Sequence, residues 1–542
     1  MAASDPNPHP AQSVADDRVQ LVRIGWERIQ LVLELRPANR EADIGPIRLE
    51  RQDEPMTEPM PPTWRGERGD AVTARFNVML GPGQRPLAAG RWELSDASGL
   101  PVILADPDAV EVGLAERTFR YRGGRYRVAP LIDRSRSVLE LHIALLRPRS
   151  RASWLRRKWR RLARSLAPRR RLFDALLRYH RSRAPRTGDR ILFTSDSRGD
   201  LSGNLAVVHD RMVERGLDAT YHLDSIFKPS VAAHRSWRDR WRLPRLLAHA
   251  DVILLDDYQP IIYRLPPDGG QRIIQLWHAS SAFKTVGYSR VGKPGGPSPF
   301  GRRHKNYSNA IVSGQHDVPY YAEAFGLPEE RVVPTGIPRM DRFFDPEHRA
   351  ASVAQARANF PQIADRFVIL FAPTFRGSGP RTASYDYDQV DWADLHAAAV
   401  ARDAVVIVKM HPFIREPAPI PVELRDRLID GTRTPMDVND LLFAVDLLIT
   451  DYSSIVFEFS TQLKPMLFFA YDLDEYVASR DFYVPFEEFV PGRIARTFDE
   501  VTDSIRTDAY EAEKVPVFRR RHFDHLDGGA TDRVIDQLIL PG

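Results

Sequence analysis

The alternation of apolar and polar residues changes character twice along the chain, near residues 147 and 190. Before residue 147, short stretches in which every second residue is apolar, such as residues 19–24 and 29–35, are separated by glycine-bearing turns. Strand-length alternation with such turns is typical of a small antiparallel β domain. We therefore predict a β domain at residues 17–146, following a polar N-terminus, residues 1–16, that we expect to be disordered.

From residue 190 onward, wholly apolar stretches of strand length alternate with helical patterns. Strands that are apolar on both faces indicate parallel sheets covered by helices on each side. A break near Gly336 divides the region, so we predict an α/β fold class, a pair of doubly wound Rossmann-like domains at residues 190–335 and 336–542, the second carrying the C-terminal helices. The strand-like stretches lie at residues 191–194, 252–255, 273–276, 310–312, 368–371, 405–408 and 447–450.

A strongly basic segment at residues 147–189 separates the two regions. From residue 147 to residue 190 there are 17 Lys or Arg and two Asp, although the whole chain has a net charge of only +5. Residues 152–166 have helical spacing, with a narrow apolar stripe beside a wide basic face, which suits an amphipathic helix lying in an anionic membrane surface. The residues that we expect to bind the membrane are Leu155, Arg156, Arg157, Trp159, Arg160 and Arg161.

Two other interpretations of this segment remain open. A solvated helix packed on the next domain would show the same pattern. Nucleic acid binding is the third interpretation, but neither a stacking platform for single strands nor a nucleic-acid motif accompanies the charge, so we expect no nucleic acid partner.

Length and composition narrow the classes of protein. At 542 residues the chain exceeds what one core usually supports, and its lack of cysteine excludes disulfides, thiolate metal sites and a cysteine nucleophile. The N-terminus has neither the basic start nor the apolar core of a secretory signal. The longest apolar stretch, residues 441–459, contains Asp446 and Asp451 and is too charged to span a bilayer. We therefore expect neither export nor a membrane span.

A histidine stands at the end of one predicted strand of the first α/β domain. The strand at residues 273–276 leads directly into Trp277 and His278. Ligands bind at the carboxyl ends of parallel strands, and a group with a near-neutral pKa there is suited to act as a general base. A hydrogen-bonded structural histidine is the alternative.

Three strand-end loops of the second α/β domain carry further candidates. Arg376 follows one strand, His411 the next, and a run from Thr450 to Ser454 a third, just before a predicted helix. The start of a helix binds anions, and serine hydroxyls add donors, but Asp and Ser are also ordinary N-caps without any ligand. Together, a guanidinium, an imidazole and a helix N-terminus are suited to hold a diphosphate and to stabilise charge on a departing phosphate.

Other reaction classes lack their signatures in this sequence. There is no GxGxxG or Walker sequence, which argues against dehydrogenase and ATPase chemistry. No acidic pair suited to a divalent cation is apparent either. We therefore expect no cofactor and no metal.

The motifs from about residue 191 to residue 496 resemble those of the CDP-glycerol glycerophosphotransferase family, the teichoic acid polymerases and primases. Many separate motifs occur in the family's order, whereas the β domain is outside the resemblance. The matching pieces are Gln275-Leu-Trp-His, Thr335-Gly-Ile-Pro-Arg-Met-Asp341, Ala372-Pro-Thr-Phe-Arg, Lys409-Met-His-Pro, Ile449-Thr-Asp-Tyr-Ser-Ser, Lys464-Pro-Met-Leu-Phe-Phe, Tyr471-Asp-Leu-Asp-Glu-Tyr, Arg480-Asp-Phe-Tyr483 and Pro491-Gly492.

The resemblance implies a GT-B type fold and an enzyme that moves a polyol phosphate from a CDP-alditol to a lipid-linked or polymeric cell-envelope acceptor, with release of CMP. We expect a peripheral location on the cytoplasmic face of the membrane, because the basic helix would hold the enzyme against the inner leaflet, where such acceptors reside. His278 matches the histidine on the acceptor side, and His411 matches the one beside the donor diphosphate. The donor-binding positions implied by the match are Arg376, Thr450, Asp451, Ser453 and Ser454.

The chain departs from the family pattern at two positions. Ala279 and Ser280 follow His278 where the family commonly has Gly-Thr, and Phe375 replaces a frequent Trp. The added methyl group of Ala279 restricts the backbone beside the expected base, which leaves the identity of the polyol open. Two other functions remain as alternatives: a GT-B glycosyltransferase that moves a sugar, and a nonenzymatic envelope-binding protein.

Overall fold

The computed structural model describes most of the chain. Two predictions, the disordered N-terminus at residues 1–16 and the basic helix at residues 152–166 with its membrane-binding residues, lie outside the described residues and stay predictions. The described residues are 18–37, 44–54, 56–68, 71–121, 124–146, 168–266, 270–293, 296–377, 382–414, 416–479 and 481–540.

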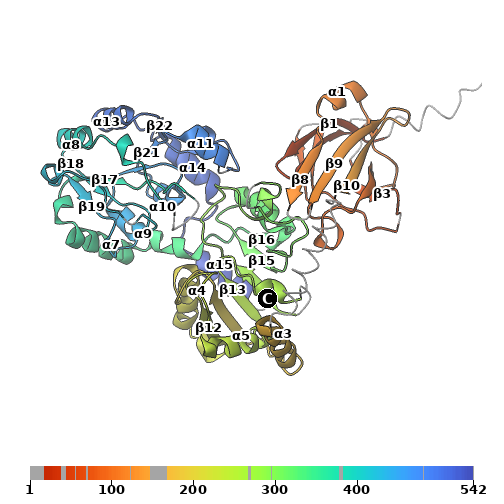
Figure 1. Ribbon diagram of the computed structural model, residues 1–542, viewed down its shortest axis with the longest axis horizontal. Helices are drawn as coiled ribbons and strands as arrows, with labels where there is room; N and C mark the ends of the chain where they lie inside the picture. Colours follow the sequence, from red (N-terminus) through yellow and green to blue (C-terminus); the bar gives the residue numbers. More distant parts are fainter. Residues whose placement is uncertain are drawn as a thin grey trace, which may run out of the picture.

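Three sheets organise the described part of the chain (Figure 1). One ten-stranded, mainly antiparallel sheet lies before residue 147, and two six-stranded, wholly parallel sheets follow. Parallel strands need crossover connections, which here are mostly helices, so the predicted α/β class is confirmed for the region after residue 190. The β domain lies beside the first parallel sheet and away from the second (Figure 1).

The antiparallel sheet has a hydrophobic core of its own. Along β2 and β5, alternate side chains such as Leu31, Leu33 and Phe76 are fully buried, as the period of two predicts. Its strands are β1 (Gln20–Glu27), β2 (Gln30–Arg36), β3 (Arg48–Arg51), β4 (Trp64–Arg68), β5 (Ala71–Asn77), β6 (Gly90–Ser95), β7 (Ile103–Leu104), β8 (Arg117–Tyr121), β9 (Gly124–Asp133) and β10 (Val138–Leu146), with the helix α1 (Pro107–Val112).

The first parallel sheet has the strand order β12-β11-β13-β14-β15-β16 among the described residues, so the order reverses between β11 and β13. Three of the four residues of β14, Ile273, Ile274 and Gln275, are buried. Its elements are β11 (Arg190–Ser195), β12 (His222–Phe227), β13 (Val252–Leu255), β14 (Arg272–Gln275), β15 (Asn309–Ile311) and β16 (Val332–Val333), with α3 (Pro168–Arg181), α4 (Gly203–Glu214), α5 (Trp237–His249) and α6 (Val318–Phe325).

In the second parallel sheet the described strands have the order β19-β18-β17-β20-β21-β22, which reverses between β17 and β20. A crevice is expected at the carboxyl ends of these two strands. The elements are β17 (Phe367–Phe371), β18 (Ala404–Val408), β19 (Leu428–Asp430), β20 (Leu447–Thr450), β21 (Met466–Phe469) and β22 (Arg493–Ala495), with α7 (Pro346–Asn359), α8 (Trp392–Ala401), α9 (Val438–Leu441), α10 (Ile455–Ser460), α11 (Leu473–Ser479), α12 (Phe486–Phe489), α13 (Phe498–Thr507), α14 (Lys514–His522) and α15 (Ala530–Val534).

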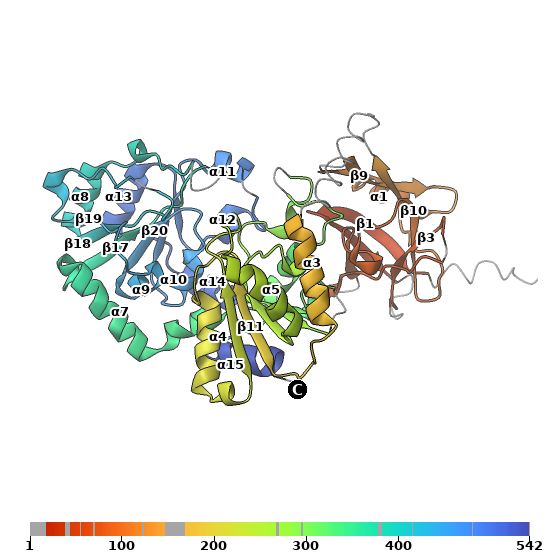
Figure 2. The same cartoon turned by 60° about the horizontal axis from the view of Figure 1, so that its bottom comes forward.

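The end of the chain returns to the first of these domains. Helix α15 lies beside α4 (Figure 2), where Arg211 Nη2 is 2.8 Å from Asp532 Oδ2 and Arg215 Nη2 is 2.7 Å from Asp536 Oδ1. Arg272 also donates to the Leu538 carbonyl oxygen at 3.0 Å. Contacts therefore place α15, within the predicted range 336–542, against the domain predicted at residues 190–335, and the bounds of the two domains stay a prediction.

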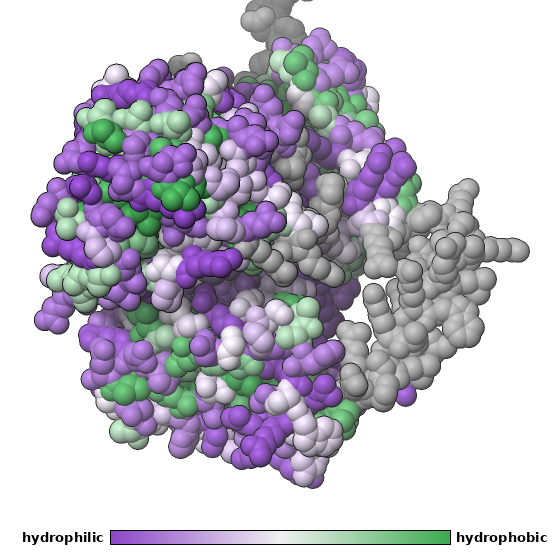
Figure 3. Space-filling view, turned by 60° about the vertical axis from the view of Figure 1, so that its left-hand side comes forward, coloured by the Kyte–Doolittle hydropathy of each residue, from purple (hydrophilic) through white to green (hydrophobic). Residues whose placement is uncertain are grey.

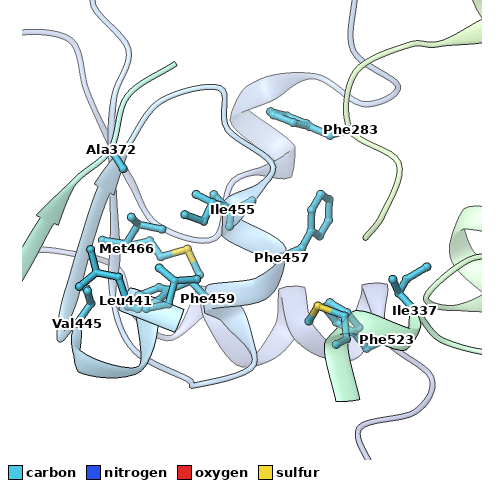
Figure 4. Close-up of a cluster of buried hydrophobic side chains, with 14 of the residues drawn as sticks. Phe283, Ile337, Ala372, Leu441, Val445, Ile455, Phe457, Phe459, Met466 and Phe523 are labelled. Atoms are coloured by element: carbon cyan, nitrogen blue, oxygen red, sulfur yellow. The ribbon is translucent and has the colours of Figure 1, made fainter. Parts of the chain in front are cut away.

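Helix α10 stands between the two domains in a shared apolar core. Ile455, Phe457 and Phe459 project from it, with Met466 of the second domain on one side and Phe283 of the first domain on the other (Figure 4). These side chains are all at least nine-tenths buried. Because close packing resists displacement, α10 and the loop before it are held in place from both sides.

Polar side chains cover most of the face shown in the space-filling view, and the apolar ones are scattered (Figure 3). Among the described helices, none has the length and the apolar content needed to cross a membrane.

Candidate functional site

A cavity of about 590 Å³, here called the interdomain cleft, lies between the two α/β domains. His278 and Arg339 line it from the first domain and the connection that follows it. His411, Ser453 and Ser454 line it from the second domain. Four of the seven predicted catalytic and donor-binding residues therefore meet in one cavity. The remaining lining is formed by residues 372, 409, 410, 412, 432, 434–439, 455 and 458.

The loop that carries His278 is shaped by buried amides. Trp277 has a φ of 51°, an uncommon conformation for a bulky residue. Gln275 Oε1 accepts from the Trp277 N–H at 2.9 Å, and Asn204 Nδ2 donates to the Trp277 carbonyl oxygen at 2.7 Å. Asn204 Oδ1 also accepts from the Arg339 N–H at 3.0 Å. These hydrogen bonds stabilise the strained conformation of Trp277, directly before His278. They also connect the loop to Arg339.

His278 combines an exposed imidazole with a lowered basicity. Its side chain is 46% exposed, and Nδ1 lies 3.6 Å from Asp257 Oδ1. Although the side chain keeps part of its surface exposed, the surrounding protein displaces water from the ring, and this desolvation lowers the pKa of His278. The charge of Asp257 opposes this shift, and the positive charge of Arg339 lowers the pKa further. A neutral imidazole at neutral pH can accept a proton, and the carboxylate of Asp257 favours the tautomer with the proton on Nδ1 and a free Nε2.

His411 is held in the opposite tautomer. Its Nδ1 accepts from the Phe413 N–H at 3.1 Å, so the neutral ring carries its proton on Nε2. The rings of Phe375 and Phe413 lie 4.7 and 4.6 Å from the imidazole. Burial lowers the pKa of His411, and the charge of Lys284 lowers it further. His411 is therefore a neutral hydrogen-bond donor, which suits contact with a phosphate oxygen.

The two serines differ in their local role. Ser453 Oγ accepts from the Ile455 N–H at 3.4 Å, a long contact that is part of the N-cap interpretation. Ser454 is exposed and directly precedes α10, but its side chain makes no capping bond. Ser454 therefore lines the cleft without capping α10. Ser453 lines the cleft and also accepts a hydrogen bond from the start of α10.

Arg376 supports the donor loops from outside the cleft. Its Nε donates to Asp472 Oδ2 at 2.5 Å, its Nη2 donates to Asp472 Oδ1 at 2.8 Å, and its Nη1 donates to Asp451 Oδ2 at 3.0 Å. Thr450 Oγ1 donates to the Ala372 carbonyl oxygen at 2.7 Å, and Asp451 Oδ1 accepts from the Thr374 N–H at 2.8 Å. None of the three lines the cleft. Carboxylates occupy both edges of the Arg376 guanidinium, and direct contact of these three residues with the donor stays a prediction.

Four charged residues that we did not predict line the cleft: Arg339, Lys409, Asp437 and Glu458. Arg339 Nη2 donates to Ser280 Oγ at 3.0 Å and also bonds Glu458 Oε1, while Glu458 Oε2 has no partner among the described residues. Lys409 Nζ donates to the Gly431 carbonyl oxygen at 3.3 Å, and burial lowers the pKa of Lys409. Arg339 and Lys409 belong to sequence motifs on which the family resemblance rests, so these motifs could have identified them as site residues. Thr432 and Thr434, also in the lining, carried none.

Two doubly wound domains face each other across a cleft that has His278 on one wall and His411, Ser453 and Ser454 on the other, an arrangement typical of nucleotide-binding α/β enzymes. The family model for CDP-glycerol:poly(glycerophosphate) glycerophosphotransferases matches residues 176–540. The chain belongs to this family, which confirms the resemblance drawn from its motifs and extends it beyond residues 191–496.

Curated relatives and solved structures agree with this assignment. The chain is 42% identical over 421 residues to the teichoic acid ribitol-phosphate polymerase TarK of Staphylococcus aureus, covering 76% of this chain and 82% of TarK. It is 34% identical to TarL, another teichoic acid ribitol-phosphate polymerase of Staphylococcus aureus, over 96% of this chain and 99% of TarL. The match with TarL therefore includes the β domain. A structure of the wall teichoic acid polymerase TagF has the same fold, with a TM-score of 0.56 and 22% identity over 72% of this chain and 97% of TagF.

Proposed function

We propose that this chain transfers a polyol phosphate from a CDP-alditol to a hydroxyl group of a lipid-linked or polymeric acceptor, with release of CMP. The observation that carries the proposal is the convergence of His278 and His411, from facing domains, on one cavity that also contains Ser453 and Ser454. A base and a set of phosphate-binding donors on opposite walls are what an in-line displacement at phosphorus requires.

The reaction assigns a role to each wall. The acceptor hydroxyl oxygen attacks the β-phosphorus and forms the new phosphodiester bond, the bond from this phosphorus to the bridging oxygen breaks, and CMP leaves with that oxygen. His278 accepts the hydroxyl proton on Nε2. His411 Nε2–H, Lys409 and Arg339 lie where they can stabilise the diphosphate oxygens. Lys409 and Arg339 supply positive charge and His411 supplies a neutral donor, so we expect no essential metal and no cofactor.

Ribitol phosphate is the alditol phosphate that we propose for the donor. The curated relatives with 34% to 42% identity that cover two thirds or more of the chain are named as ribitol-phosphate polymerases. A glycerol-phosphate primase of Bacillus subtilis is only 26% identical over 54% of the chain. Selectivity between alditols then depends on the acceptor-side loop with Ala279 and on the cleft wall at residues 432–439.

We also propose that the enzyme acts as a peripheral protein on the cytoplasmic face of the membrane, where a lipid-linked acceptor resides. The support is the basic segment at residues 147–189, of which the structure describes only the part from Pro168. In that part, α3 still carries Arg169, Arg170, Arg171, Arg178 and Arg181.

Donor competition tests the proposal against its alternatives. The chain is incubated with a soluble acceptor and CDP-ribitol, CDP-glycerol or a panel of nucleotide sugars, and released CMP and polymer products are measured by chromatography and mass spectrometry. We expect acceptor-dependent CMP release from CDP-ribitol in preference to CDP-glycerol. Turnover of a nucleotide sugar only would support a glycosyltransferase, and binding without turnover of any donor would support an envelope-binding protein.

A further inference from the structure

A second cavity of about 440 Å³, here called the junction cavity, lies where the β domain meets the first α/β domain. The turn at residues 83–86 lines it from the β domain. Tyr263, Leu265 and residues 299–302, 305 and 306 line it from the α/β domain. It shares no lining residue with the interdomain cleft. A site here would give the β domain, which lies against this side of the molecule (Figure 1), a part in binding.

The junction cavity is positively charged. Arg85 and Arg302 are exposed side chains from opposite domains, no ion pair joins either of them to a described residue, and the described lining has no carboxylate. Lys305 is buried, and its Nζ donates to the Gln84 carbonyl oxygen at 2.5 Å and to that of Met79 at 3.3 Å. Burial, together with the charge of Arg85, lowers the pKa of Lys305 to about 8, so the ammonium group stays largely protonated at neutral pH. Three uncompensated cations around one space favour an anion.

The same wall contains a buried hydrogen-bond acceptor, Asn306 Oδ1, that has no donor among the described residues. Asn306 is only 8% exposed. Its Nδ2 donates to the Ile262 carbonyl oxygen at 2.7 Å, but its Oδ1 has no hydrogen-bond partner among the described residues. An unpaired buried acceptor is costly, and a donor from a ligand removes that cost. Phe300, 46% exposed, and Tyr263 add aromatic faces to the lining. Phosphate charge, hydroxyl donors and a short carbon chain are together the features of a polyol phosphate.

A strip of side chains joins the junction cavity to the catalytic wall. The ring of Tyr263 lies 5.7 Å from that of Tyr258, and the Arg303 guanidinium lies 5.3 Å from the centre of the Tyr258 ring. Tyr258 directly follows Asp257, the residue 3.6 Å from His278 Nδ1. Aromatic and cationic side chains therefore form a continuous strip that runs from His278 to the junction cavity beside the β domain.

We propose that the junction cavity binds a polyol-phosphate unit of the growing polymer, behind the unit whose terminal hydroxyl reaches His278. Arg85 and Arg302 bind its phosphate. A rotation of the Asn306 amide, whose Oδ1 is buried in the structure, lets that oxygen accept from one of the hydroxyl groups of the bound unit. The β domain thereby holds long acceptors in place for repeated additions. This inference rests on the proposed function, because it takes the acceptor to be a polyol-phosphate polymer.

The test compares two acceptors of different length. The variant carries Arg85→Ser and Arg302→Ser, two exposed positions whose loss leaves the fold intact. CMP release is measured with an acceptor that carries one polyol-phosphate unit and with one that carries a long chain of them. We expect the KM for the long acceptor to rise about tenfold and the products to be shorter, while KM for the one-unit acceptor and kcat for both stay unchanged.

A matched control removes the same charge elsewhere. Arg357→Ser with Arg520→Ser, two exposed positions on α7 and α14 of the second domain, should leave both KM values unchanged. An unchanged KM for the long acceptor in the junction variant, or an equal rise for both acceptors, would overturn the proposal.

A binding measurement separates this proposal from the proposed function. Calorimetry with purified poly(ribitol phosphate) and no donor reports polymer affinity independently of turnover. We expect the Arg85/Arg302 variant to bind the polymer about tenfold more weakly and with a smaller salt dependence, since two phosphate contacts are lost. If the unsubstituted chain turns over no CDP-alditol but binds polymer through these residues, the proposed chemistry fails and the junction site stands. Equal polymer affinity of the variant and the unsubstituted chain overturns the junction site.

Discussion

Replacing His278 by Gln removes the proposed general base and keeps a side chain of similar size at the end of β14. Loss of a general base typically lowers turnover by about a hundredfold to ten-thousandfold. That range corresponds to about 3 to 5 kcal/mol of lost transition-state stabilisation. Donor affinity should be nearly unchanged, because most groups assigned to the diphosphate stand on the opposite wall. His411→Gln should instead lower both donor affinity and turnover.

The pH dependence gives the same prediction a second measurement. Burial lowers the pKa of His278 from its ordinary value of 6.5, and Asp257 works in the opposite direction. A base acts in its deprotonated form, so kcat/KM should fall as the pH drops through that pKa, with a midpoint below 6.5. Asp257→Asn removes the charge that raises the pKa and should move the midpoint to still lower pH. His278→Gln should abolish this fall.

The assay follows CMP release from CDP-ribitol by chromatography between acid and neutral pH, with calorimetry for donor affinity and circular dichroism for folding. His222→Gln, at an exposed position on β12 outside the cleft lining, is the matched control and should behave like the unsubstituted chain. If His278→Gln abolished donor binding but spared turnover of bound donor, the two walls would be reversed. If kcat/KM of the His278→Gln variant still fell at low pH as it does in the unsubstituted chain, another group would be the general base.

The remaining predictions concern donor binding, stability and membrane attachment. Ser453→Ala with Ser454→Ala should cost about 1 to 3 kcal/mol in donor kcat/KM, because two hydroxyl donors are lost while backbone donors remain; unchanged kinetics would leave this loop a simple N-cap. Arg376→Met should lower the free energy of unfolding, measured with urea, by about 3 to 5 kcal/mol, since it leaves the buried Asp451 carboxylate unpaired; a loss of donor affinity at full stability would support its role as a direct ligand. Replacing four of the arginines on the predicted basic helix should release the protein from anionic vesicles in sedimentation at low salt, with turnover of a soluble acceptor retained; tight binding to neutral vesicles would contradict this. These four substitutions are Arg156→Ser, Arg157→Ser, Arg160→Ser and Arg161→Ser.

The cleft residues that could be predicted share one property. His278, His411, Ser453 and Ser454 each follow an apolar strand that the sequence pattern alone identifies. Because parallel strands of a sheet end at the same edge, His411, Ser453 and Ser454, which follow strands of the second parallel sheet, are expected to lie near one another. His278 follows a strand of the first parallel sheet, so it meets them only through the packing of the two domains. Strand period, loop position and side-chain chemistry therefore determined the class of fold and the core of the site.

Only the tertiary structure decided where the neighbouring side chains point. Arg376 also follows a strand, yet Asp472, from a loop almost a hundred residues later, binds its guanidinium, and Arg376 is not part of the cleft lining. Glu458 and Arg339 enter the site through a bond between the two domains. The junction cavity likewise exists only where the turn around Arg85 docks on another domain. Such pairings join residues distant in sequence, and they follow from packing of whole domains, which no local pattern along the chain encodes.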